Sequence, residues 1–371
     1  MRFALFHPFL QHSEVKNALP AHSPPDAAAV ISDARAASRR PTSYDVARLA
    51  GVSQSAVSRA MRDGTSIAPK TRAKVMRAAE ALGYAPNTIA RSLITRTSHL
   101  VAVLVTETTA RNYPDVFFHL GQEIQATGNH MLVFTLPRDE ATAGIVQDIA
   151  GYHVDGVISA VSMGREALQA CERHRLPVVL YNRLPRGPFA SAVGCDHATG
   201  MADLVEQLSK ARLGRIFFLA GPKDAVVSED RLAGARAALA RAGHQIAGIV
   251  HADYSYQQGR AAARQMLAGP ERPDTVLCAN DAMALGLIDA CRFELRLRIP
   301  DDVQVTGFDD LPQSAWPSHD LTTVRQPVEM LTRAAVRMLG ERMPGPGIGP
   351  ERRLMPAEVK LRGSTRRPAD S

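Results

Sequence analysis

Gln54, Ser55 and Arg59 are polar residues whose types and spacing are suited to the reading of nucleic acid bases. On a helix that starts after Ser53, all three point to the same side, away from the apolar residues. Arginine can donate two hydrogen bonds to guanine, and glutamine can pair with adenine. Each residue alone is typical of ordinary polar surface, but together they predict a helix that reads base edges.

Three short helices are needed to position this group, and the sequence carries start and stop signals for them. Thr42 followed by Asp45 resembles a capping box, and Gly51 is suited to end the first helix. Ser53 can cap the second helix through its hydroxyl, and Pro69 suits the first turn of the third. Apolar residues at helical spacing predict a shared core that consists of Val46, Leu49, Ala50, Val57, Ala60, Met61, Val75, Ala78, Ala79 and Leu82. Together these signals predict a helix-turn-helix domain.

Positive charge is concentrated in the same part of the chain. Residues 39–98 hold eleven Lys and Arg against three acidic residues, a net +8, whereas the whole 371-residue chain carries +7. A basic module on a nearly neutral body indicates a polyanionic partner. Arg48 and Lys70 are candidates for phosphate contacts that set the register on DNA.

From residue 98 onward, short apolar runs alternate with helical stretches. This alternation predicts parallel sheets covered by helices, and the length of the segment favours two similar lobes. Ligands of such sheets bind beyond the carboxyl ends of the strands, where this sequence places Thr106, Asn182, Asn280 and Asp309. We therefore expect a ligand site in a cleft between the lobes.

Other function classes find little support in the sequence. It contains no GxSxG, HExxH or phosphate-loop motif, so we expect neither an enzyme nor a metal or cofactor site. The four cysteines lack CxxC spacing and fall in apolar runs, which predicts buried reduced thiols. No apolar run approaches the roughly 18 residues of a membrane span. We expect a cytoplasmic protein without a membrane partner.

Residues 42–364 closely resemble the LacI/GalR (lactose-repressor) family of bacterial transcription regulators. The resemblance rests on the segments TSYDVARLAGVSQSAVSRAM, TRAKVMRAAEALGYAPNTIARSL, VDGVI, RLAGARAAL, ANDAMALG, IPDDVQVTGFDD and DLTTVRQP. It implies a helix-turn-helix domain in front of a two-lobed α/β body like a type I periplasmic binding protein. It also implies a repressor that binds a pseudo-palindromic double-stranded DNA operator as a homodimer and responds to a small effector.

The resemblance further implies which residues contact DNA. In the helix-turn-helix domain they are Thr42, Tyr44, Ser53, Gln54, Ser55, Ser58 and Arg59. Residues 86–94 resemble the family's hinge helix, which lies in the minor groove with Leu93 wedged between base pairs. Asn87, Ala90 and Arg91 are expected to pack beside Leu93 or to contact phosphate. So short a helix is marginal unless something packs on it. The alternative is that Leu93 is a plain core residue of a linker.

In the body, the resemblance assigns effector contacts to Arg231, Asp309, Asn280, Asn182 and Tyr254. Arginine and aspartate can hydrogen-bond to hydroxyl or carboxylate groups, and a tyrosine ring can cover the apolar face of a sugar. An interlobe salt bridge is the alternative for Arg231 and Asp309, and structural roles remain open for Asn182 and Tyr254. The effector is expected to be a sugar or sugar acid, acting as inducer or co-repressor.

These observations predict five segments along the chain. They are a disordered extension (1–40), the helix-turn-helix domain (41–85), the hinge (86–97), the effector-binding and dimerisation body (98–364) and a tail (365–371). Tyr113, Phe117 and Trp316 are further candidates for the cleft. A solute-binding protein for transport would explain the body but leave the basic helical module without a role.

Overall fold

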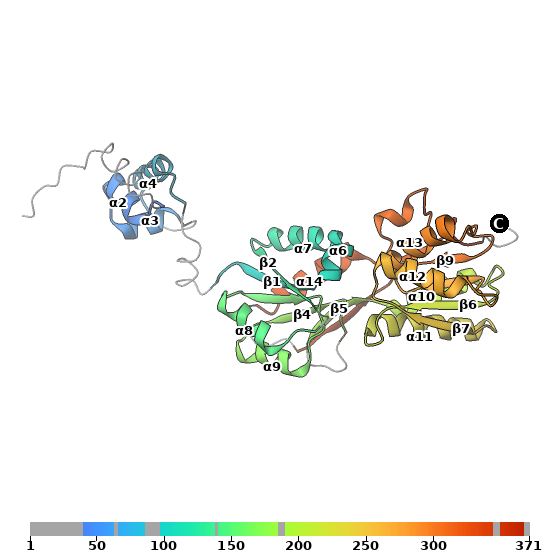
Figure 1. The fold of residues 1–371 in the computed structure, drawn as a ribbon. Coiled ribbons are helices and arrows are strands. Elements are labelled where there is room, and N and C mark those ends of the chain that lie inside the picture. Colours follow the sequence, from blue (N-terminus) through green and yellow to red (C-terminus); the bar gives the residue numbers. More distant parts are fainter. Residues whose placement is uncertain are drawn as a thin grey trace, which may run out of the picture. The chain divides into compact units, whose positions relative to one another are not determined.

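The chain divides into two compact units, residues 1–95 and 96–371 (Figure 1). The computed structural model describes residues 40–62, 66–85, 97–137, 140–184, 190–343 and 349–366. The predicted extension up to residue 39, the hinge residues Asn87, Ala90 and Leu93 and the last tail residues lie outside the described part. The segment boundaries given above therefore stay predictions.

The first unit contains the three expected helices, α2 (Ser43–Ala50), α3 (Gln54–Ala60) and α4 (Pro69–Leu82). The Asp45 carboxylate accepts a hydrogen bond from the backbone N–H of Thr42 (2.9 Å), and Gly51 ends α2 with φ +63°. The Ser53 hydroxyl accepts from the backbone N–H of Ala56 at 3.2 Å and so caps α3. The buried residues shared by the three helices are Val46, Ala47, Val57, Ala60, Val75, Ala78 and Ala79.

The Ser53 cap should contribute measurably to the stability of this small unit. Ser53→Ala leaves an N–H at the start of α3 without its partner and should cost about 1 kcal/mol. Hydrogen exchange at the buried amides of the unit, measured on the full chain, reports this loss. Ser66→Ala is the control, because Ser66 is exposed, lies outside the helices and caps none of them. Equal losses in the two variants would contradict the assigned cap.

The second unit consists of two lobes, each built on a parallel sheet with helices on its faces (Figure 1). The first-lobe sheet has the order β11-β5-β4-β3-β1-β2. Its strands are β1 (Leu100–Thr106), β2 (His130–Leu136), β3 (Gly156–Ser159), β4 (Val178–Tyr181), β5 (Ser191–Cys195) and β11 (Arg352–Met355). Its helices are α6 (Glu107–Asn112), α7 (Pro114–Ala126), α8 (Ala143–Gly151), α9 (Arg165–Arg173) and α14 (Val328–Gly340).

The second-lobe sheet has the order β7-β6-β8-β9. Its strands are β6 (Ile216–Ala220), β7 (Ile246–His251), β8 (Thr275–Cys278) and β9 (Gln304–Thr306), beside an antiparallel pair of β10 (Thr323–Arg325) and β12 (Glu358–Lys360). The helices are α10 (His197–Leu208), α11 (Val226–Arg241), α12 (Tyr256–Leu267) and α13 (Asp281–Asp289), with a π-helical turn at Ala290–Glu294 and a 3₁₀ turn at Pro312–Ala315. The predicted two-lobed α/β fold is confirmed.

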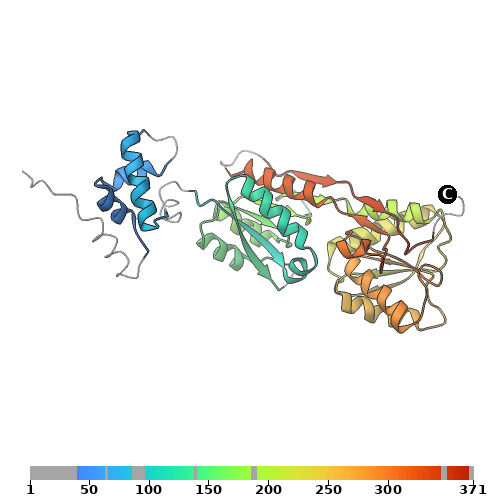
Figure 2. The same ribbon diagram turned by 90° about the horizontal axis from the view of Figure 1, so that it is seen from above.

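The chain passes between the lobes at three places in the described residues. It crosses from β5 to α10, from β10 to α14 and from β11 to β12. Figure 2 shows the red C-terminal segment running along both lobes. Helix α14 packs on the first-lobe sheet, where Gly156 leaves room for the Leu339 side chain. The lobes are therefore joined by several short connections rather than by one linker.

Two expectations from composition concern the interior. All four cysteines are buried and unpaired, as predicted, and burial raises the pKa of the Cys195 thiol to about 12. Among the described residues, no helix combines the length and the apolar character needed to cross a membrane.

Candidate functional site

The first unit presents the predicted polar face on helix α3. Gln54, Ser55 and Arg59 are exposed, while Val57 on the same helix is 1% exposed in the core. The Gln54 amide donates a hydrogen bond to the Ser43 hydroxyl at 3.3 Å, which ties α3 to the start of α2. The helix therefore offers donors and acceptors outward from a fixed base, as base-edge recognition requires.

The remaining predicted DNA contacts of this unit lie at the starts of α2 and α3 or on α3. Thr42, Tyr44 and Ser53 are exposed, and Tyr44 keeps 72% of its accessible surface. Ser58 is half-buried on α3. Arg48 forms an ion pair with the buried Asp45 at 2.8 Å. Part of the predicted phosphate-binding charge is thus already engaged within the unit.

In the second unit, Arg231 and Asp309 form a buried ion pair. The Arg231 guanidinium lies 3.1 Å from the Asp309 carboxylate, with side-chain exposures of 3% and 2%. It also donates to the carbonyl of Ala279, and its Cζ lies 3.8 Å from the centroid of the Phe308 ring. Both members of the pair belong to the second lobe, so the ion pair that was the alternative prediction exists but is not interlobe.

Tyr113 instead connects Asp309 to the first lobe. Its hydroxyl, from the segment between α6 and α7, donates to Asp309 at 2.7 Å. Gln326, on the connection from β10 to α14, donates to Asp309 at 2.6 Å and accepts from the Asn182 amide at 2.5 Å. The structure thus joins Asn182, Gln326, Asp309 and Arg231 in one hydrogen-bonded chain across the cleft.

Burial and charge govern the ionisation of this cluster. Burial raises the pKa of Asp309, while the Arg231 guanidinium and the Tyr113 and Gln326 donors lower it. Burial, and then the Asp309 charge, raise the pKa of Tyr113 well above its ordinary value, so Tyr113 remains a hydrogen-bond donor. Burial beside Arg231 lowers the pKa of His197 far below its usual range, which keeps this imidazole neutral.

The other predicted ligand residues form structural hydrogen bonds. The Thr106 hydroxyl accepts from the backbone N–H of Thr109 at 3.0 Å and caps α6. The Asn280 side chain caps α13 by accepting from Met283 and donates to the carbonyl of Tyr254 at 3.1 Å. Within the described part of the chain, the buried Tyr254 hydroxyl has no hydrogen-bond partner. The proposed effector contacts of these residues stay predictions.

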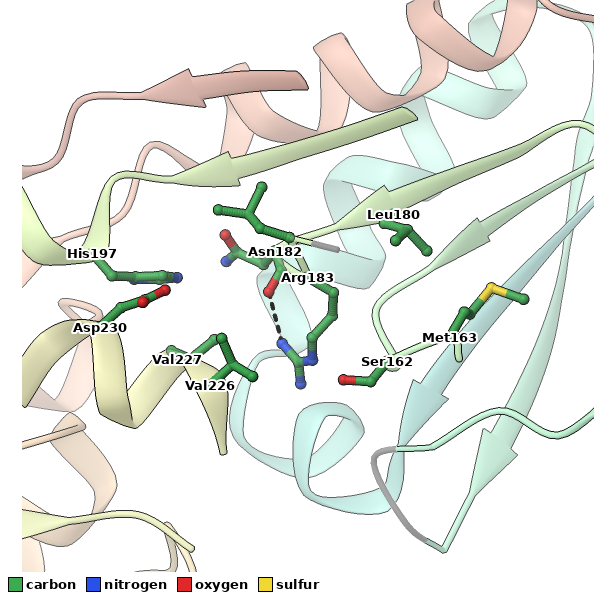
Figure 3. Close-up of a pocket in the computed structure, with 10 residues that line it drawn as sticks. Ser162, Met163, Leu180, Asn182, Arg183, His197, Val226, Val227 and Asp230 are labelled. Carbon is green, nitrogen blue, oxygen red and sulfur yellow. Dashed lines mark hydrogen bonds between the residues drawn. The ribbon is translucent and has the colours of Figure 1, made fainter. Parts of the chain in front are cut away.

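Figure 3 shows a cavity of about 170 Å³ that is lined in part by His197, the residue that contacts Arg231. Its lining residues are Ser162, Met163, Leu180, Asn182, Arg183, Leu184, His197, Val226, Val227 and Asp230. Of the predicted ligand residues, only Asn182 lines it. The sequence reasoning missed His197 and Asp230. His197 comes two residues after strand β5, so the strand-end rule that selected Asn182 could also have found it.

Two cleft candidates differ in their position. Tyr113 joins the Arg231–Asp309 cluster, as described above. Trp316 is 52% exposed, and its ring lies 6.5 Å from that of His319 at an angle of 33°. Trp316 does not belong to the lining of the cavity.

Close packing of two helices brings His197 to Arg231. Helix α11 approaches the first turn of α10 at Gly234, where a Cβ atom would lie 2.1 Å from the backbone oxygen of Ala198. Arg231 lies about one turn before this glycine, and its Nη2 lies 3.3 Å from Nδ1 of His197. A larger residue at 234 would push the helices apart and separate these two side chains.

Comparison with known proteins agrees with this architecture. Residues 42–87 match the model of the bacterial regulatory proteins of the lacI family, and residues 205–365 match the periplasmic binding protein-like domain. The HTH-type transcriptional regulator CelR of Thermobifida fusca is 32% identical over 343 residues, which cover 88% of this chain and 98% of CelR.

Solved structures give the same result. The Lac repressor dimer bound to operator and the anti-inducer ONPF has a TM-score of 0.80 at 28% identity, covering 88% of this chain and 99% of that one. The CelR–cellobiose complex has a TM-score of 0.65 at 29% identity, covering 88% of this chain and 100% of its own. With a capped three-helix domain, a two-lobed body and these relatives, the chain belongs to the lacI family of bacterial regulatory proteins.

Proposed function

We propose that this regulator represses transcription by binding a pseudo-palindromic operator as a homodimer, and that a small polar ligand in the cleft controls the binding. The observation that carries the proposal is the exposed group Gln54, Ser55 and Arg59 on a capped helix of a basic domain. Two such helices related by two-fold symmetry match the two half-sites of a palindrome. The proposal includes the other predicted DNA contacts, among them Leu93, which lies outside the described residues.

Ligand control is supported by the body. The cavity beside Arg231 and Asp309 combines apolar walls with a few polar groups, which is typical of small-molecule sites. The Lac repressor and CelR structures were solved with ONPF and with cellobiose, which favours a carbohydrate or a related polar metabolite here. If the ligand stabilises a lobe arrangement that disfavours DNA binding, DNA must weaken ligand binding by the same factor.

We infer a regulatory rather than an enzymatic role, exercised in the cytoplasm where the operator lies. The sequence carries no GxSxG, HExxH or phosphate-loop motif, and residues 42–87 match a family of bacterial regulatory proteins. A transport solute-binding protein would share the body but would have no use for α3.

A salt titration of DNA binding tests the proposal. The full chain should bind duplexes that contain candidate inverted repeats, and the affinity should fall steeply with salt because basic residues displace counterions. A chain that starts at residue 97 should lose this binding. Equal affinity of the two proteins would reject the regulatory assignment. Titration of sugars and sugar acids into the complex then shows whether the ligand acts as inducer or co-repressor.

A further inference from the structure

Two polar groups in the cavity wall have no hydrogen-bonding partner among the described residues. Nε2 of His197 is buried without a hydrogen bond, in a residue that is 4% exposed. The half-buried Asp230 carboxylate forms neither a hydrogen bond nor an ion pair with that part of the chain. Asn182 differs, because its amide donates to Gln326 and its carbonyl accepts from the backbone N–H of Cys195.

The surroundings of His197 fix which ring nitrogen carries the proton. Its Nδ1 faces Nε and Nη2 of Arg231 at 3.4 and 3.3 Å. A guanidinium only donates, so Nδ1 must be the acceptor, and the proton of the neutral ring must lie on Nε2. His197 therefore presents an N–H donor without an acceptor. Buried donors of this kind are costly and are normally satisfied.

Asp230 supplies the complementary group. Figure 3 shows the His197 ring and the Asp230 carboxylate at the same end of the cavity, away from Met163 and Ser162. A carboxylate only accepts, whereas Nε2–H only donates. A hydroxyl can accept from the imidazole and donate to the carboxylate at the same time, and two adjacent hydroxyls can share these roles.

We propose that His197 and Asp230 form a hydroxyl-recognition pair that selects a neutral polyhydroxylated ligand over its carboxylate-bearing analogue. This inference rests on the proposed function, which places the effector in this cleft. The cavity lining contains one cation, Arg183, and one anion, Asp230, and the adjacent Arg231 and Asp309 neutralise each other. A ligand carboxylate beside Asp230 would bring two negative charges together in a partly desolvated site, which disfavours binding.

Isothermal titration of the full chain tests the selectivity. The probes are neutral pentoses, hexoses and hexose disaccharides, each compared with the matched uronic acid. The neutral compound that binds best should bind about tenfold or more tightly than its uronate. Asp230→Asn should weaken the neutral ligand about tenfold and narrow its advantage over the uronate, because the repelling charge is removed. The control is Asp224→Asn, an exposed acid before the same helix that does not line the cavity.

Two substitutions at His197 distinguish the contributions of its two ring nitrogens to ligand affinity. His197→Asn can keep an acceptor for Arg231 but does not reach the position of Nε2, so affinity should fall about tenfold. His197→Gln places an amide N–H near that position and should restore most of the affinity. His244→Asn, at an exposed histidine, is the matched control. Rescue by glutamine would not occur if His197 only filled space.

Three results would contradict the proposed role of His197 and Asp230. They are tighter binding of uronates than of the neutral sugars, unchanged affinity for the neutral ligand in both His197→Asn and Asp230→Asn, and no binding of any neutral probe. Operator binding without ligand is measured on the control variants Asp224→Asn and His244→Asn, in which it should be unchanged. If the full chain bound none of the operator duplexes, the proposed function would be wrong. The ligand titrations would still show whether the cavity prefers neutral ligands to uronates.

Discussion

Arg231→Ala should lower the free energy of unfolding of the body by about 3–5 kcal/mol, because it leaves a buried carboxylate without its cation. Asp309 would keep the Tyr113 and Gln326 donors but lose the guanidinium 3.1 Å away. The same substitution removes the partner that fixes His197, so the ligand response should vanish as well. Denaturant unfolding and ligand titration measure the two effects.

The control for this experiment lies on the same helix. Arg241 forms an exposed ion pair with Glu206, and Arg241→Ala should cost less than about 1 kcal/mol. A similar small loss in Arg231→Ala would show that the buried pair contributes nothing special. If the alanine variant does not fold, Arg231→Lys keeps the charge without the two-pronged geometry and should still lose most of the ligand response.

Arg59→Ala should reduce specific operator affinity by about 1–3 kcal/mol and relax the preference at one base pair. Arg59 is exposed on α3, so the loss should come from recognition and not from unfolding. Competition binding with operators altered at single positions measures both effects. Arg77→Ala on α4 is the control, since Arg77 is exposed on another helix and should not change base preference. A uniform loss on all sequences would instead assign Arg59 to a phosphate.

The helices of the first unit could be predicted because their signals are local. Thr42, Gly51 and Ser53 act within a few residues of their own position, and each was found where its type suggests. The ends of the strands could also be predicted from the sequence, because apolar runs mark the strands and polar residues follow them. Thr106 shows the limit of such signals. Its place at the end of β1 was predicted, but its hydroxyl caps the next helix.

The hydrogen bonds and ion pairs in the cleft could not be predicted, because they depend on contacts between elements that are distant in the sequence. His197 meets Arg231 only because α10 and α11 pack closely at Gly234, and no local pattern states that distance. Tyr113 reaches Asp309 from the other lobe, 196 residues away in sequence. The resemblance identified Arg231 and Asp309 but not Asp230, for which the described residues provide neither a hydrogen bond nor an ion pair.

His197 lies next to one of the short connections between the lobes, where it can influence the angle between them. His197 begins the helix that follows one connection, and Gln326 lies on another. A change in the angle between the lobes has to turn on these segments. A molecule that binds to His197 therefore binds next to a hinge between the lobes. A small displacement at the hinge rotates one lobe and so moves its distant end much farther.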